Sequence, residues 1–197
     1  MAEKALDATN VGVAKGNTGN AGGYAWVGAV TDTLPTDAKT AIDAKFKSLG
    51  FISEDGLANA TETESEDYKD WGGTVVKSEQ TSYTETYEVG FLESRETVLK
   101  AVYGESNVTS DGNGGMTVKH NGNFGEERSY IFESLITATL IKRTVIPRGV
   151  INERDDVEEN SSDLIVYKPT IKCLPDAKGN TSYAYYYDSS KAGGAAA

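Results

Sequence analysis

Cysteine and histidine each occur only once in this chain of 197 residues. Because Cys173 is alone, no intrachain disulfide is possible. The only histidine, His120, lies in a Gly/Asn-rich segment, which favours a surface position over a catalytic one. Cys173 lies in a predicted strand, and no second histidine is present to activate it, so we expect a buried structural thiol. An enzyme needs a convergent set of acid, base and nucleophile, and we therefore expect no catalytic residues.

Long apolar runs and an excess of positive charge are also missing. No stretch reaches the length needed to cross a bilayer, and no apolar run follows the first residues as in a secretory leader. The net charge of −11 and the pI near 4.6 argue against a surface that neutralises nucleic-acid phosphates. We expect a soluble protein that is made in the cytoplasm, without membrane insertion and without specific DNA binding.

Motifs for metal ions and phosphate groups are incomplete. Residues 111–115 begin like a calcium loop, but the twelfth position is Gly122 instead of a bidentate glutamate. The glycines at 16–23 lack the lysine and hydroxyl residue of a phosphate-binding loop. Acidic clusters at 62–67 and 153–159 are interpreted as solvated loop surfaces. We therefore predict no metal site and no cofactor.

Glycine is plentiful, with 21 residues, and the hydrophobic content is a modest 38%, which together favour short strands and turns. Residues 81–92 alternate, with Tyr83, Tyr87, Val89 and Phe91 on one face, interrupted by Glu85. Residues 128–146 are too long for one ordinary strand and should turn near 137–139. Further strands are predicted at 24–30, 49–52, 116–119, 150–157, 164–174 and 183–187, with a break at 147–149.

Two helices are predicted. The first is short, over 37–47, and opens at Thr36 or Asp37. The second has Ser94 as its N-cap and ends at Gly104. An apolar stripe along the second helix indicates that it packs against the sheet; its residues are Val98, Leu99, Val102 and Tyr103.

The segment 59–81 is polar and acidic, with Trp71 as its single large apolar residue before two glycines. A connection of this length in a compact domain usually has a function, and we interpret it as a long loop. The predicted organisation is a flexible arm over 1–22, one domain over 23–188 and a flexible tail over 189–197. The fold class is mainly β, a two-sheet sandwich or barrel with one flanking helix.

Five local strings, in order and at the right spacing, resemble the major tail tube proteins of siphophages, the phages with long non-contractile tails. The resemblance covers roughly residues 24–187. The strings are LGFISEDG at 49–56, DYKDWGG at 67–73, FLES leading into VLKAVYG over 91–104, RTVIPRGVINER at 143–154, and residues 167–176 with the glycine-containing turn that follows.

The resemblance implies a structural virion protein whose hexameric rings stack into the tail tube, with sheets joined edge to edge within each ring. The segment 59–81 would then be the loop that reaches the neighbouring ring. Its candidate contact residues are Glu62, Glu64, Glu66, Asp67, Asp70 and Trp71. The implied partners are other copies of the chain, a tape measure protein, and terminator and distal tail proteins. Trp71 either anchors the inter-ring contact or packs on its own domain.

The acidity then suggests an acidic bore that repels DNA phosphates, so that the genome slides through without binding. Two alternatives remain open at this point. The chain could form the tube of a bacterial secretion or contractile injection system, or it could be a monomeric acidic β-sandwich binding module. An enzyme is the third possibility, and the single histidine counts against it.

Overall fold

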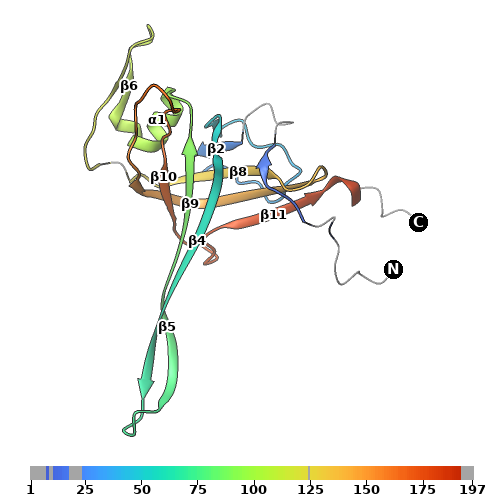
Figure 1. Ribbon diagram of the computed structural model, residues 1–197, viewed down its shortest axis with the longest axis vertical. Helices are drawn as coiled ribbons and strands as arrows, with labels where there is room; N and C mark the ends of the chain where they lie inside the picture. Colours follow the sequence, from blue (N-terminus) through green and yellow to red (C-terminus); the bar gives the residue numbers. More distant parts are fainter. Residues whose placement is uncertain (1–7, 9–10, 18–23, 124, 192–197) are drawn as a thin grey trace.

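The computed structural model describes residues 8, 11–17, 24–123 and 125–191, and most of the strands belong to one nine-stranded sheet (Figure 1). The second sheet is a two-stranded hairpin, β6–β7. The strands are β1 Lys15–Gly16, β2 Ala25–Gly28, β3 Lys47–Ser48, β4 Ile52–Lys69, β5 Val75–Phe91, β6 Val108–Ser110, β7 Met116–Val118, β8 Arg128–Leu135, β9 Leu140–Arg154, β10 Pro169–Cys173 and β11 Tyr183–Asp188; the helices are α1 Glu96–Tyr103 and the short 3-10 turns η2 Glu105–Asn107 and η3 Ser189–Lys191.

Strand β9 is the central strand of the large sheet and pairs with three other strands. One of its edges pairs with β8, and the other pairs first with β11, up to Val145, and then with β10, from Gly149 onward. The main path through the sheet is β3-β2-β8-β9-β10-β5-β4, and all of these pairs are antiparallel. This arrangement places β4 at one end of the path, with the long β4–β5 hairpin extending away from the body (Figure 1).

A different hydrophobic core lies on each face of the sheet. The first core packs α1 and β6 against the inward residues of the central strands, among them Val89, Phe91, Tyr130, Ile146 and Ile171. The second core is smaller and lies under the segment that connects β2 to β3; it consists of Trp26, Phe46, Ile131 and Val145. Alternation along β8 explains the division, because Tyr130 and Phe132 face the first core and Ile131 faces the second.

The mainly-β prediction with one flanking helix is confirmed: the described residues form two sheets and one α-helix. Helix α1 buries Val98, Leu99, Val102 and Tyr103, as the apolar stripe predicted. Gly104 ends the helix with φ +96°, a conformation that glycine adopts without a steric penalty. The predicted N-cap was wrong, because Arg95 occupies that position without a side-chain cap and the Ser94 hydroxyl pairs with the Tyr167 hydroxyl at 2.9 Å.

The short helix predicted over 37–47 does not form. The Asp37 carboxylate accepts hydrogen bonds from the backbone N–H groups of Lys39 and Thr40, at 2.7 and 2.5 Å. Arg143 donates to the carbonyls of Asp37 and Thr40, both at 2.8 Å. The bonds to the Asp37 carboxylate are those that an N-cap side chain makes, so they do not oppose a helix. The carbonyls of Asp37 and Thr40, which helical N–H groups would use, are instead taken by Arg143. Bonds from the side chain and backbone of Thr40, then from the backbone of Lys39, lower the pKa of Asp37 to about 2.

The predicted turn near 137–139 is confirmed, with the Thr137 hydroxyl accepting the Leu140 N–H at 3.1 Å. The break predicted at 147–149 was wrong, because β9 continues through Pro147 to Arg154. The pairing with β8 shifts register here, and β9 changes its other neighbour from β11 to β10. Proline is tolerated because this is a bulge where the ladder does not need its missing N–H.

The domain boundaries remain predictions. Most of the predicted arm, 1–22, lies outside the described residues, but Lys15–Gly16 within it pairs with β8. Of the predicted tail, residues 189–191 form η3 and the remainder lies outside the described part of the chain. In the described residues, no helix is both long and apolar enough to span a membrane.

A buried ion pair secures the segment that covers the second core. The side chains of Arg143 and Glu133 are 4% and 3% exposed, and the guanidinium donates two hydrogen bonds to the carboxylate. The two remaining bonds from Arg143, to Asp37 and Thr40, fasten the covering segment to the sheet. Buried charges are tolerated only when they are paired and hydrogen-bonded in this way.

We expect Arg143→Ala to lower the free energy of unfolding by about 3–5 kcal/mol, because it leaves the buried Glu133 carboxylate without its guanidinium. The matched control is Arg148→Ala, which breaks the exposed pair with Glu127 and should cost only about 0–1 kcal/mol. Urea unfolding followed by tryptophan fluorescence measures both values. Equal losses in the two variants would contradict the role assigned to Arg143.

Candidate functional site

The candidate site is the outer part of the β4–β5 hairpin, from Ala58 to Thr81, which we call the hairpin arm. Every residue of the arm is exposed. Its two strands remain paired from Ala58–Glu88 to Lys69–Val75, with register shifts after Glu64 and after Tyr68. At about 3.3 Å per residue, the paired strands extend roughly 35 Å. Figure 1 shows the arm projecting from the body, with no other element beside its outer half.

The sequence interpretation of 59–81 as a loop was therefore wrong, because the segment forms the outer part of the β4–β5 hairpin. Threonine, tyrosine and valine recur along both strands, and these residues favour extended backbone. Acidic side chains can occupy strands when both faces are solvated, which is the case here. The signal that could have revealed the hairpin is the continuation of the alternating pattern of 81–92 back toward Val75.

The tip of the arm is a tight turn that presents a large aromatic side chain. Asp70 sets the turn: its carbonyl accepts the Gly73 N–H at 3.0 Å, and its carboxylate accepts the Thr74 N–H at 2.8 Å. Trp71 is 106% exposed, so the alternative that it packs on its own domain is excluded. Tyr68, Val75 and Val76 add exposed apolar surface beside it. A group of apolar side chains with no cover in the monomer is typical of an interaction surface.

The predicted acidic residues line the arm but do not converge. Glu66 lies directly opposite Glu79, a like-charge pair that weakens the ladder. Two local contacts offset this repulsion, since Lys77 pairs with Glu79 and the Tyr68 hydroxyl donates to Glu66 at 3.3 Å. Glu64 accepts from the Ser82 hydroxyl at 3.1 Å. Glu62 and Asp67 are exposed, and the arm as a whole carries six acidic and two basic residues.

The base of the arm is held by a buried carboxylate that sequence reasoning assigned only as an interruption of the apolar face. Glu85 is 6% exposed. It accepts hydrogen bonds from the Asn59 amide and the Ser182 hydroxyl, both at 3.0 Å, and from the Thr181 hydroxyl. Three donors satisfy a carboxylate that would otherwise be costly to bury. The network joins β4, β5 and the segment before β11, and it fixes the direction in which the arm leaves the body.

The described residues do not assemble a catalytic or metal site. His120 is exposed and lies edge-on to Tyr103, with ring centroids 4.9 Å apart. Cys173 is buried in β10, and burial raises the pKa of its thiol to about 12, aided by the charge of Glu85. No three His, Cys, Asp or Glu side chains of the described residues could together hold a metal ion. Residues 111–115 form a turn in which the Asp111 carboxylate accepts backbone N–H groups.

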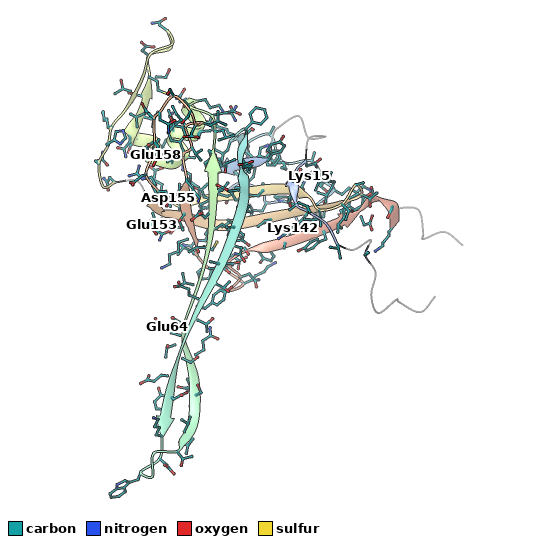
Figure 2. The ribbon with its side chains drawn as sticks, viewed as in Figure 1. Lys15, Glu64, Lys142, Glu153, Asp155 and Glu158 are labelled. Atoms are coloured by element: carbon teal, nitrogen blue, oxygen red, sulfur yellow. The ribbon has the colours of Figure 1, made fainter. Side chains whose placement is uncertain are left out.

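Acidic residues also gather on the body, along the end of β9 and the link to β10. Glu153, Asp155 and Glu158 lie on this side, and Lys15 and Lys142 lie on the other side of the body (Figure 2). Lys168 balances part of the acidic side by pairing with Glu88 at 2.8 Å and with Asp155 at 3.8 Å. The charge of the monomer is thus unevenly distributed over its surface.

Comparison with known families gives one finding. A family model described as phage tail tube protein matches residues 15–195, which is most of the chain. A search of curated proteins returned no match. The matched range includes both cores and the whole hairpin arm.

The burial of Cys173 predicts that its thiol is inert in the folded protein. At pH 8 we expect no reaction with a thiol-specific chromophore on the timescale in which an exposed cysteine reacts completely, because a pKa near 12 leaves almost no thiolate. One equivalent should react after unfolding in guanidinium. Rapid labelling of the native protein would contradict the placement of Cys173 in the core.

Proposed function

Since the chain belongs to the phage tail tube protein family, we propose that it forms hexameric rings that stack into the non-contractile tail tube of a siphophage, the conduit for DNA ejection. The observation that carries this proposal is the hairpin arm, in which every residue from Ala58 to Thr81 is exposed. An isolated two-stranded hairpin is at best marginally stable in water. An arm that buries nothing in its own chain therefore gains its cover from other copies.

Contact between rings is supported by the composition of the tip. Trp71 is the kind of large amphipathic residue that dominates binding energy at interfaces, and it lies fully exposed in the turn between β4 and β5. The tight turn set by Asp70 fixes the backbone that carries Trp71, so the backbone loses little conformational entropy on docking. In the proposed tube, the arm of one ring reaches the next ring.

Contact within a ring is supported by the sheet edges. Strand β4 has 18 residues and ends the strand path, so among the described strands its outer edge has no ladder partner. A long edge of this kind is a template for pairing with another chain. We propose that this edge pairs with a different edge of the neighbouring subunit, for which β3, at the other end of the strand path, is the candidate. Such a heterologous contact can close into a ring.

The net charge of −11 per chain supports a passive role toward DNA. Negative walls repel phosphates within a screening distance of about 8–10 Å, so an acidic bore would keep the genome from adhering as it passes. The proposed partners besides sister subunits are a tape measure protein inside the tube and terminator and distal tail proteins at its ends. Assembly would take place in the host cytoplasm and end in the virion.

Two other functions compete with this proposal. The family match favours a tube over a monomeric acidic binding module, because a tube requires self-association. The tube of a secretion or contractile injection system remains the nearer alternative. Capsid, tape measure and terminator genes beside this one would support the phage tail, whereas a sheath gene in that position would support a contractile system.

Removing the aromatic tip should block stacking. We expect Trp71→Ala to reduce tube length or number at least tenfold in negative-stain images, with ring formation and the unfolding midpoint unchanged, because the residue makes no contact in the monomer. Leu164→Ala is the matched control, since Leu164 is also exposed, at 73%, and lies away from the arm. Normal tubes from the Trp71 variant would contradict the proposed role of the tip.

Neutralising acidic residues should change the rate of genome ejection without preventing tube assembly. One variant carries amides at Glu62 and Glu64, the acidic positions of the arm farthest from its tip, and a second carries amides at Glu153, Asp155 and Glu158. We expect the set that faces the bore to slow genome ejection while tubes still form, because DNA then meets less repulsion. Ejection is measured as DNA release from purified virions after receptor addition. Unchanged ejection with both variants would exclude the acidic bore.

A further inference from the structure

A second surface has the properties needed to receive the tip of the arm. It is a groove of about 420 Å³ on the body, between β1, the start of β4 and the strands β8 and β9. Its apolar lining comes from Tyr24, Leu57, Phe132 and Ile136. This volume is within the range of about 300–1,000 Å³ that is typical of sites enclosing a ligand. An apolar groove of this size that the described residues leave open favours an apolar occupant.

The rim of the groove is basic. Lys15 and Lys142 line it, and neither lysine makes an ion pair within the described part of the chain. Glu133 also lines the groove, but it is neutralised by Arg143, so Glu54 is the one acidic group there without an ion pair among the described residues. The arm has the complementary character: an exposed indole at Trp71, and Glu66 and Asp67 further back along β4 among six acidic and two basic residues.

We propose that this groove receives the Trp71 tip of a second copy of the chain, with Lys15 and Lys142 facing the acidic side chains of the arriving arm. This inference rests on the proposed tube, because it assigns the landing site of the inter-ring contact. The occupant cannot be the chain's own tip. Leu57 in the groove and Lys69 near the tip lie on the same paired strand, about 40 Å apart at 3.3 Å per residue.

The distance between tip and groove determines the spacing of successive copies along the proposed tube. A copy displaced along the arm by about 40 Å, one arm length, brings its tip level with the groove of the next copy. Tip and groove are different surfaces, so each copy still offers a free tip at one end and a free groove at the other. A heterologous contact of this kind does not close on itself along that direction and grows into an open polymer.

Cysteine cross-linking within assembled tubes tests the assignment. The variant pair is Gly72→Cys at the tip and Ser134→Cys in the groove. A Cβ at Gly72 would lie 3.3 Å from Asp70 Oδ1, so the Asp70 carboxylate has to move by a few tenths of an ångström to accept it. Ser134 lines the groove. Cys173 is buried and adds no background. With a short bismaleimide, most of the protein should run on denaturing gels as a ladder extending beyond hexamers, whereas each single variant should remain largely monomeric.

A matched control places the first cysteine in the acidic link instead, as Ser161→Cys with Ser134→Cys. A ladder from this control and none from the tip variant would overturn the proposal, because the groove would then receive the acidic link of a neighbour. Tubes that form without a ladder from the tip variant would also overturn it, while leaving the proposed tube intact. A wild-type chain that forms no tubes at all would instead remove the proposed function on which the assignment rests.

Discussion

The structure depends on strand β5, whose inner half is buried in the body and whose outer half is exposed in the hairpin arm. Its inner half lies between β10 and β4, and Tyr87, Val89 and Phe91 are buried in the first core. Among the described strands, its outer half has only β4 as a neighbour. Because β5 is one continuous strand, the orientation of its buried half determines the direction of its exposed half. The Glu85 network lies at the boundary and prevents the arm from pivoting where burial ends.

The sequence predicted those parts of the fold that local patterns determine. Alternation located the inner half of β5, and an apolar stripe followed by Gly104 located α1, because burial on one face leaves a period in the sequence. The predictions failed where a distant residue decided the outcome. Residues 37–47 have helix-compatible composition, but Arg143, more than 100 positions away, takes the carbonyls that a helix would use. Pro147 remains in a strand because it lies where β9 changes its neighbour from β11 to β10. No local sequence pattern reveals that change.

The segment 59–81 was singled out from the sequence, but its structure as a paired hairpin was not predicted. Trp71 was identified because a tryptophan in a polar, acidic stretch is unusual. The strands around it were missed because neither face is buried, so the pattern of apolar and polar residues that identifies most strands is weak there. Glu85 and the groove could not be predicted, since both are assembled from segments that meet only in the folded chain.

The unpaired edge of β4 has a consequence for the free subunit. Backbone groups that can bond to a sister chain in a tube can also bond to any extended chain before assembly, which is the usual route to aggregates. The six acidic residues of the arm oppose such encounters by mutual repulsion, in the manner of gatekeeper residues. That protection weakens as salt shortens the range of the repulsion. Higher ionic strength should therefore shorten the time for which unassembled subunits stay in solution before they aggregate.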